Sequence, residues 1–315
     1  MYRIGVDLGG TNIAVGVVTE DLKIIGRGKV KTKCPRPAEE IFDDIAVAVE
    51  MAVKDAGISM DEVSSVGVGT PGSVNKSNGY IEFANNLAFD QVPAKEMLEA
   101  RIGKPVYLDN DANCAALGEA IAGAGKGVGN FVAVTLGTGV GSGIIVDGKI
   151  VCGVNYAGGE MGHTVIMFNG KQCNCGRKGC WEQYASATAL ISQTKEAMLA
   201  NKDSKMWQLT NGNVDNASGR TAFDAMRLGD ESAQKVVDDY IAYVAVGVIN
   251  IINTFQPEFV CIGGGVSHEG ETLLAPLRKH VESERYSLHS SKQCAVVAAE
   301  LGNDAGIFGA ALLDE

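Results

Sequence analysis

Apolar and polar residues change their spacing several times along the chain, and each change predicts a secondary-structure element. Residues 3–18 predict a strand, a glycine turn and a second strand, and a third strand is expected over 22–32. Apolar residues at helical spacing predict a helix over 39–56, with Gly57 where a helix C-cap is expected. Strands are also expected over 63–69, 105–108 and 259–262, and helices over 93–102, 112–124, 235–253 and 305–313.

The first pattern occurs a second time. Residues 132–146 repeat the order strand, glycine turn, strand of residues 4–18, and Asp147-Gly148 predicts a hairpin turn into a third strand. Two copies of one supersecondary unit predict a duplicated α/β fold with two similar lobes, the alternative being a chance similarity of glycine-rich hairpins. We expect a smaller lobe of residues 1–118 with about 303–315, and a larger lobe of residues 119–302.

Composition narrows the class of protein. The 315 residues are 46% hydrophobic and 21% charged, with a formal net charge of −11, as in an acidic globular protein of about two domains. Lys29, Lys31 and Lys33 alternate as on the solvated face of a strand, so nucleic acid is not an expected partner. A strand beginning by Arg3 leaves no room for a signal peptide, and no continuous apolar run reaches about 18 residues. We expect a cytoplasmic protein that does not enter membranes.

Three glycine turns each follow an expected strand, and small residues there allow backbone N–H groups to approach phosphate oxygens. One such turn alone is more often a plain hairpin, and none matches a P-loop or a convincing dinucleotide fingerprint. Asp7 lies in an apolar strand just before the first turn, where a carboxylate needs a partner. It is interpreted as a Mg²⁺ anchor near the phosphates, or else as a satisfied structural aspartate. The turns are Gly9-Gly10-Thr11, Gly137-Thr138-Gly139 and Gly263-Gly264-Gly265.

Two carboxylates end another strand, in the run Asp109-Asn110-Asp111. Asp109 fits a helix cap, which is the common role of such a residue before a helix. Asp111 is then expected at or near the helix start, where the helix dipole favours its ionised form. An ionised carboxylate there suits a general base for a sugar hydroxyl, although spacing alone does not separate a base from a cap.

The most specific local pattern is His163-x9-Cys173-x-Cys175-x4-Cys180. Three thiolates and one imidazole complete a tetrahedral zinc site without a vacancy, which indicates a structural rather than a catalytic ion. The alternative is a chance cluster of thiols in a surface loop. Gly176 and Gly179 allow the tight turn that such a site needs. Glu160 and Glu182 flank the pattern, and carboxylates suit sugar hydroxyls as acceptors, although each can also be an ordinary surface residue.

Through these motifs the whole chain resembles the ROK family of bacterial sugar kinases and repressors, and within it the glucokinases. The resemblance implies an actin-like, ribonuclease H-like fold of two lobes with a cleft between them. It also implies ATP as phosphate donor, Mg²⁺, a structural Zn²⁺ and a homo-oligomer, dimer or tetramer. The motifs that carry it are Asp7-Leu-Gly-Gly-Thr-Asn, Asn86-Leu87, Asp109-Asn-Asp-Ala-Asn, Leu136-Gly-Thr-Gly-Val-Gly, Gly159-Glu-Met-Gly-His163 and Cys173-Asn-Cys-Gly-Arg-Lys-Gly-Cys-Trp-Glu182.

The resemblance also implies a role for individual residues. Asp111 matches the catalytic base of the family, and His163 would both bind zinc and face the sugar. The positions that match sugar-binding residues are Asn86, Asn110, Glu160, His163 and Glu182. The positions that match the phosphate-binding turns are Gly10, Thr11, Thr138 and Gly139, with Gly264 and Gly265 on the adenosine side.

These expectations favour phosphorylation of D-glucose on its 6-hydroxyl. Kinases for N-acetylmannosamine, N-acetylglucosamine, mannose or allose are the alternatives, because the residues that discriminate the sugar 2-position cannot be identified from the sequence. A non-catalytic sugar sensor is a third interpretation, which Asp111 and the phosphate turns disfavour. The repressor branch of the family carries a helix-turn-helix before the first strand, and only two or three residues precede that strand here.

Overall fold

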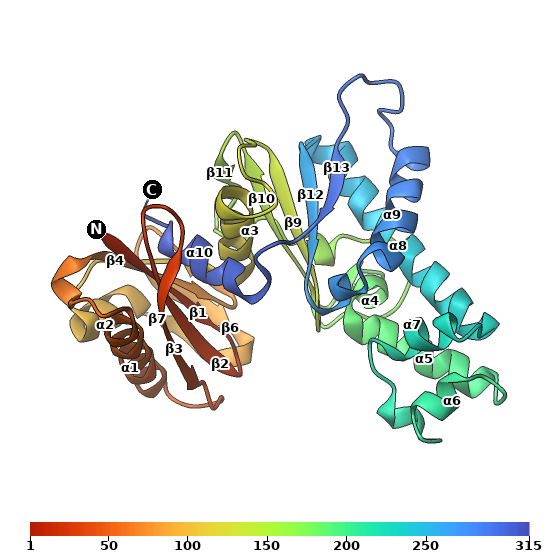
Figure 1. The fold of residues 1–315 in the computed structure, drawn as a ribbon, viewed down its shortest axis with the longest axis horizontal. Helices are drawn as coiled ribbons and strands as arrows, with labels where there is room; N and C mark the ends of the chain where they lie inside the picture. Colours follow the sequence, from red (N-terminus) through yellow and green to blue (C-terminus); the bar gives the residue numbers. More distant parts are fainter. Residues whose placement is uncertain (315) are drawn as a thin grey trace. The chain divides into compact units, whose positions relative to one another are not determined.

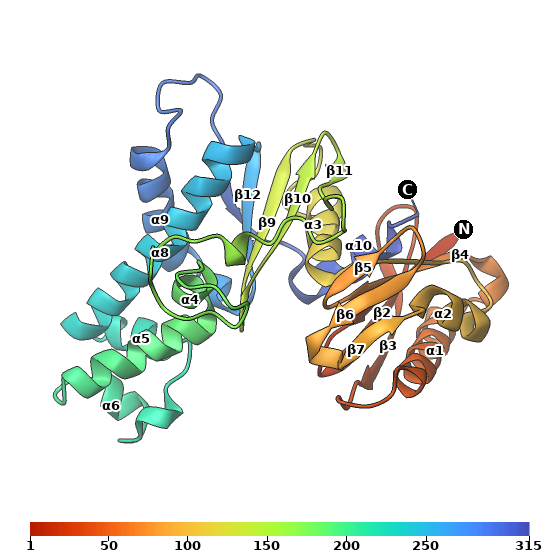
Figure 2. The same ribbon diagram turned by 180° about the vertical axis from the view of Figure 1, so that it is seen from behind.

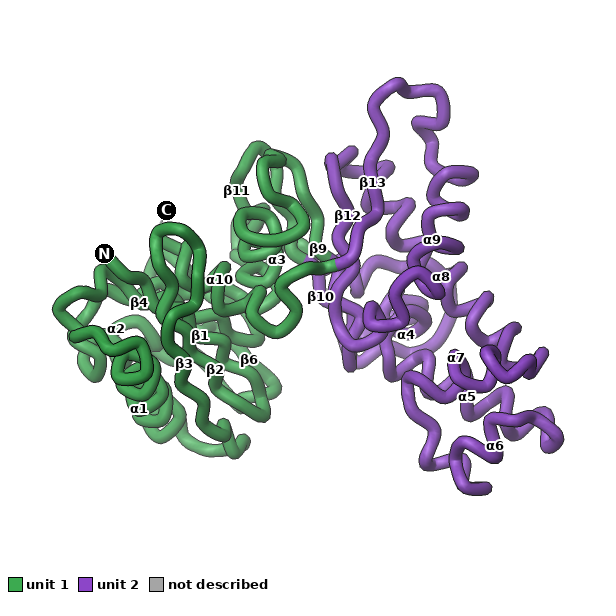
Figure 3. The backbone as a smooth tube through the Cα atoms, in the orientation of Figure 1, with its two compact units in different colours: residues 1–133, 143–159, 299–315 green, residues 134–142, 160–298 purple. Residues whose placement is uncertain are grey.

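A computed structural model describes residues 1–314 of the chain as two compact units. Each unit is assembled from separate segments of the chain (Figure 3). The lobe limits expected at 118/119 and 302/303 remain a prediction about folding domains. Unit 1 comprises residues 1–133, 143–159 and 299–315, and unit 2 comprises residues 134–142 and 160–298.

Unit 1 contains a five-stranded sheet (Figure 1). Strand β1 pairs antiparallel with β2 and parallel with β4, so the strand order is β3-β2-β1-β4-β8. Strands β1 and β2 are buried over most of their length, which explains the nearly continuous apolar runs of the sequence there. The strands are β1 (Tyr2–Leu8), β2 (Asn12–Val18), β3 (Ile24–Lys31), β4 (Val63–Thr70) and β8 (Val106–Asn110).

Helices cover this sheet. Helix α1 (Ala38–Ala56) packs on β2 and β3 through its buried apolar stripe, beside α2 (Ala94–Ile102). Helix α10 (Ala305–Ala311) packs on β1 and β4 and also against α3 (Asp111–Ala122). Its backbone approaches the sheet closely: a Cβ atom on Gly5 would lie 1.9 Å from the Ile307 carbonyl oxygen. Only glycine fits there, so the last helix is fixed on the first strand.

A second, smaller sheet in unit 1 was not predicted (Figure 2). It consists of β5 (Ser73–Asn75), β6 (Tyr80–Ala84) and β7 (Phe89–Val92), with β6 in the middle and antiparallel to both neighbours. The strands are short and rich in polar residues, so their alternation is hidden in the sequence. A short 3₁₀ turn over Asn85–Leu87 follows β6 and carries Asn86.

The second five-stranded sheet has the order β11-β10-β9-β12-β13, which matches the first sheet strand for strand. The repeated strand–turn–strand occupies the same place in both, so the predicted duplication is confirmed. Its strands are β9 (Phe131–Leu136), β10 (Val140–Val146), β11 (Lys149–Ile150), β12 (Phe259–Gly263) and β13 (Ala295–Ala298).

Most of unit 2 is helical, and helix α8 (Glu231–Phe255) packs against four of its neighbours. With a mean hydropathy of 1.4 over 18 residues, α8 is long and apolar enough to cross a membrane by composition, which the sequence pattern had not suggested. That window is 61% buried within the protein, as expected of a core helix. Its neighbours are α4 (Glu182–Ala185), α5 (Ala187–Ala200), α7 (Thr221–Arg227) and α9 (Glu271–Glu284); α6 (Met206–Leu209) packs on α7.

Candidate functional site

Asp111 is the first residue of helix α3, directly after strand β8. The sequence predicted Asp109 as the helix cap, but the cap is Asn110. The Asn110 side chain accepts hydrogen bonds from the N–H groups of Ala112 (2.9 Å) and Asn113 (3.3 Å). Asn110 therefore caps the start of α3, and Asp111 Oδ1 also accepts a hydrogen bond from the Ala112 N–H at 2.9 Å, which holds one carboxylate oxygen at the helix start. Asn110 also donates from Nδ2 to the Gly72 carbonyl oxygen at 3.0 Å. Its amide group therefore stabilises the fold here, in addition to any contact with a sugar.

Two carboxylates of unit 1 have raised pKa values, those of Asp7 and Asp111. Burial, with a contribution from the charge of Asp111, raises the pKa of Asp7 from 3.8 to about 6. Burial also raises the pKa of Asp111, against hydrogen bonds from the Ala112 N–H and the Asn110 side chain. Both groups titrate closer to neutral pH than an exposed aspartate, which is typical of functional carboxylates.

The first glycine turn joins β1 to β2. The Gly9 N–H donates to the Asn12 carbonyl oxygen at 3.0 Å, and Thr32 holds the turn through hydrogen bonds to the Gly9 and Thr11 carbonyl oxygens at 2.6 and 3.0 Å. Gly10 and Thr11 are exposed at its tip. Asn86 lies beside this tip, since a Cβ atom on Gly10 would be 4.0 Å from the Asn86 Cβ.

The second glycine turn, between β9 and β10, is held by residues that follow the cysteine pattern. Glu182 accepts a hydrogen bond from the Val140 N–H at 3.1 Å, and Thr188 donates to the Thr138 carbonyl oxygen at 2.8 Å. A Cβ atom on Gly139 would lie 2.3 Å from Glu182 Oε2, so a larger residue there would displace this carboxylate. Sequence reasoning gave Glu182 to the sugar alone and missed its contact with the turn.

The third turn follows β12 and lies close to the second. Gly264 has a φ of 83°, and a Cβ atom there would lie 2.6 Å from backbone atoms of Leu136, the last residue of β9. Gly264 and Gly265 are both exposed. The two glycine turns of unit 2 therefore present adjacent stretches of backbone with little side-chain cover, which is suited to phosphate or ribose groups.

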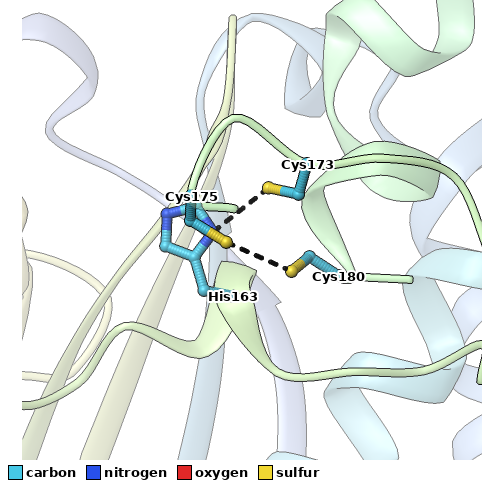
Figure 4. A group of neighbouring side chains, drawn as sticks. All are labelled: His163, Cys173, Cys175 and Cys180. Carbon is cyan, nitrogen blue, oxygen red and sulfur yellow. Dashed lines mark hydrogen bonds between the residues drawn. The ribbon is translucent and has the colours of Figure 1, made fainter. Parts of the chain in front are cut away.

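The predicted zinc ligands lie together in unit 2 (Figure 4). The ligand atoms of His163, Cys173, Cys175 and Cys180 are all within 4.8 Å of one another. Cys175 Sγ is 3.6 Å from Cys180 Sγ, and Cys173 Sγ is 3.6 Å from His163 Nδ1. Zinc–sulfur bonds of 2.3 Å in a tetrahedron place sulfur atoms about 3.8 Å apart, so the donor set fits the ion.

The loop around these ligands is built for a tight fold. Gly176 and Gly179 have φ values of 91° and 79°, which confirms their predicted role in the turn. Gln183 Nε2 donates to Cys173 Sγ at 3.6 Å, a partner of the kind that supports metal-bound thiolates. Trp181 is fully buried, and its Nε1 donates to the Tyr243 carbonyl oxygen of α8 at 2.8 Å, which fixes the end of the loop.

Glu160 and His163 begin and end one short helical turn. The His163 N–H donates to the Glu160 carbonyl oxygen at 3.1 Å, and the Met161 N–H donates to Ser142 Oγ at 3.1 Å. With Nδ1 of His163 directed at Cys173, the other ring nitrogen is left for a second partner. The Glu160 side chain is exposed.

The predicted residues thus gather in two sets, one in each unit. Asp7, Gly10, Thr11, Asn86, Asn110 and Asp111 belong to unit 1. Thr138, Gly139, Glu160, His163, Glu182, Gly264 and Gly265 belong to unit 2, with the three cysteines.

Comparison with known proteins identifies the family. The sequence profile of the ROK family matches residues 3–315. The chain belongs to the ROK family. It is 41% identical over 310 residues to a glucokinase of Thermotoga maritima, covering 98% of this chain and 95% of that protein. It is 39% identical over 310 residues to a glucokinase of Streptomyces coelicolor, covering 98% and 96%.

A solved structure is similar over the same length. The ROK family glucokinase from Streptomyces griseus, crystallised with glucose and AMPPNP, superposes with a TM-score of 0.83 at 38% identity and covers 99% of both chains. This ROK chain therefore has the predicted actin-like, two-lobe α/β fold, as its two matching five-stranded sheets also indicate.

Proposed function

We propose that this ROK protein is a glucokinase, which transfers the γ-phosphoryl group of ATP to the 6-hydroxyl of D-glucose. The chain is an ATP-dependent hexose kinase: full-length relatives at 39–41% identity are glucokinases, and the Streptomyces griseus homologue holds glucose and AMPPNP, an analogue of ATP. The observation that carries the choice of glucose is this identity to glucokinases over 98% of the chain.

Asp111 is the proposed general base. A base must reach the sugar hydroxyl in its ionised form, and it works best when its pKa is close to the working pH. Burial moves the pKa of Asp111 in that direction, and the hydrogen bond from the Ala112 N–H to Asp111 Oδ1 orients the carboxylate at the start of α3. Asp111 would accept the hydroxyl proton as the sugar oxygen attacks the γ-phosphorus atom and the bond to ADP breaks.

Other residues would position the two substrates. Gly10, Thr11, Thr138 and Gly139 would donate backbone or hydroxyl hydrogen bonds to phosphate oxygens, with Gly264 and Gly265 near the adenosine. Asn86, Asn110, Glu160, His163 and Glu182 would bind sugar hydroxyls. Holding the acceptor oxygen and the phosphoryl group in line is the main work of a kinase site.

Two metal ions fit the residues present. Asp7 is a buried carboxylate whose charge is disfavoured by burial and by Asp111, so a Mg²⁺ ion held there, directly or through water, would offset both effects. Bound Mg²⁺ neutralises phosphate charge in such reactions. Zn²⁺ on His163, Cys173, Cys175 and Cys180 would cross-link the loop that ends at Glu182, and so fix Glu182 and His163 in place.

A sugar panel tests the proposed substrate. Release of ADP is measured with glucose, mannose, allose, N-acetylglucosamine, N-acetylmannosamine and no sugar. We expect the highest kcat/KM with glucose and almost no ATP turnover without sugar. No preference for glucose would contradict the glucokinase assignment, and sugar-independent turnover would contradict the kinase mechanism. No turnover with any sugar, together with measurable sugar binding, would indicate a sensor.

A further inference from the structure

An ion pair between a buried carboxylate and a partly exposed lysine, 32% exposed, lies next to the proposed base. Asp109, two residues before Asp111, pairs with the Lys76 ammonium, and the Asp109 side chain is only 3% exposed. Its other oxygen accepts hydrogen bonds from the Asn110 N–H at 2.7 Å and from Asn113 Nδ2 at 2.9 Å. Exposed ion pairs such as Met1–Glu20, Lys23–Asp21 and Lys235–Asp239 contribute little, whereas breaking the Lys76–Asp109 pair leaves the buried Asp109 charge without its cation.

Lys76 follows strand β5, in the three-stranded sheet that the sequence did not reveal. The same segment makes a second contact with the strand end, because Gly72 accepts the hydrogen bond from Asn110 Nδ2. Two ties therefore join residues 72–76 to Asp109 and Asn110, immediately before Asp111. The Lys76–Asp109 ion pair and the Asn110–Gly72 hydrogen bond both leave out Asp111, the residue proposed to accept the proton.

The three-stranded sheet also carries a proposed sugar residue. Strand β5 pairs with β6, with Asn75 opposite Tyr80, and the turn after β6 holds Asn86 beside Gly10. The Lys76–Asp109 pair thus connects the element that bears Asn86 with the strand end that bears Asp111.

The charges around Lys76 are unbalanced without it. Asp7, Asp109 and Asp111 all act on the buried Cys114 thiol and raise its pKa with burial, and Lys76 is the cation that opposes them. Burial lowers the pKa of Lys76 itself, but the charge of Asp109 and hydrogen bonds to Asp109 and Cys152 outweigh burial and raise it. Lys76 therefore remains charged beside the Asp109 carboxylate.

We propose that Lys76 is a positioning residue for phosphoryl transfer, whose ion pair with buried Asp109 holds the Asp111 carboxylate in register with the sheet that carries Asn86. This inference rests on the proposed role of Asp111. Without the Lys76 ammonium, Asp109 turns toward solvent to regain hydration, and the start of α3 shifts with it. A shift of about 1 Å at a catalytic group is enough to cost on the order of 100-fold in rate.

The test compares four variants by steady-state kinetics and thermal unfolding. We expect Lys76→Met to lower kcat by about 10- to 100-fold while KM for ATP changes by less than about threefold. Lys76→Arg keeps the charge and should recover most of kcat. Lys76→Met with Asp109→Asn removes both charges, keeps the acceptor for Asn113, and should recover at least about tenfold in kcat over Lys76→Met. Lys95→Met is the matched control, because Lys95 is an exposed lysine of the same region.

The outcomes separate this inference from the glucokinase proposal. Every variant is assayed with the hexose that the wild-type protein prefers, so a preference for another sugar defeats only the glucokinase proposal. A Lys76→Met protein with kcat within twofold of wild type, or with a loss no greater than that of Lys95→Met, overturns the inference. If Lys76→Met does not fold, the doubly substituted protein decides: folding with kcat within about tenfold of wild type supports the inference, and a larger loss overturns it.

Discussion

The two copies of the strand–turn–strand unit have the same backbone arrangement, but their carboxylates lie in different parts of the chain. Asp7 on β1 corresponds to Thr135 on β9, so the first copy carries a carboxylate in its own strand and the second does not. The second turn instead receives the Glu182 carboxylate, which accepts the Val140 N–H, from the end of the cysteine loop. The carboxylate of the first copy thus lies in its own strand, as Asp7. The carboxylate beside the second turn, Glu182, comes from the end of a loop that a bound metal would fix.

The strand ends show the same difference. In unit 1 the parallel strand β8 leads directly into Asp111, and Asp109 is held by Lys76. The corresponding strand β13 ends at Ala298, without an ionisable side chain at that point. The duplicated scaffold therefore has two similar glycine turns, whereas the carboxylate proposed to accept the proton occurs in one copy only.

The largest expected effect concerns the carboxylate that only the first copy has. Asp111→Asn should lower kcat by about 10²–10⁴-fold, because the amide cannot accept the hydroxyl proton, while glucose affinity measured by calorimetry stays close to wild type. Asp147→Asn, in the exposed turn after β10, is the control for loss of one negative charge. Near-normal turnover of Asp111→Asn with bound sugar would falsify the assignment of the base.

Removing a zinc ligand tests the source of order in the second copy. Elemental analysis should find about one zinc ion per chain, and Cys180→Ser should lose most of it because three ligands hold the ion far less tightly than four. KM for the sugar should then rise because His163 loses its fixed orientation. KM for ATP should rise because Glu182 no longer holds the glycine turn after β9. Cys34→Ser, outside the cluster, is the control. Active protein without zinc would show that the loop is ordered in another way.

Gly5→Ala tests the packing that distinguishes the first sheet. The new Cβ atom would lie 1.9 Å from the Ile307 carbonyl oxygen, so helix α10 must move and the free energy of unfolding should fall by about 1–3 kcal/mol. The corresponding residue of the second copy is Ala133, where Ala133→Gly should cost only about 0.5–1 kcal/mol. Denaturant unfolding measures the loss of stability in both variants. Equal losses would show that the packing at Gly5 is no tighter than that at Ala133.

Asp7→Asn tests the cost of a charge in the first strand. Because folding raises the pKa of Asp7 to about 6, the protonated carboxyl is favoured in the folded state. This contribution to stability is fully present below pH 4 and is lost as pH rises through about 6. In buffer without Mg²⁺ at pH 7.5, denaturant unfolding should therefore give Asp7→Asn a free energy of unfolding up to about 3 kcal/mol above that of wild type. With Mg²⁺ the variant should be less active than wild type. Lower stability of the variant would show that the ionised carboxylate has a stabilising partner.

Much of the fold could be predicted because the apolar spacing is strong where strands and helices are buried. The expected helix over 39–56 is α1, whose inward stripe includes Ile41, Ile45 and Val49. The prediction missed β5–β7, α9 and all four helices between residues 182 and 227. Most of these elements are short, and polar positions hide the period in the others. The four-ligand cluster could be predicted because cysteine spacing is specific, whereas its connection to the glycine turn through Glu182 joins residues 42 positions apart.

The sequence alone determined the family, the duplicated strand–turn–strand units and the ligand set His163, Cys173, Cys175 and Cys180, since each depends on local spacing of residue types. Only the tertiary structure decided which carboxylate caps, pairs or remains available. It made Asn110 the cap, paired Asp109 with Lys76, and gave Glu119 three backbone N–H groups, those of Ala124, Glu300 and Leu301. The physical reason is that a buried carboxylate must find its partners across the fold, at sequence distances that no local pattern records.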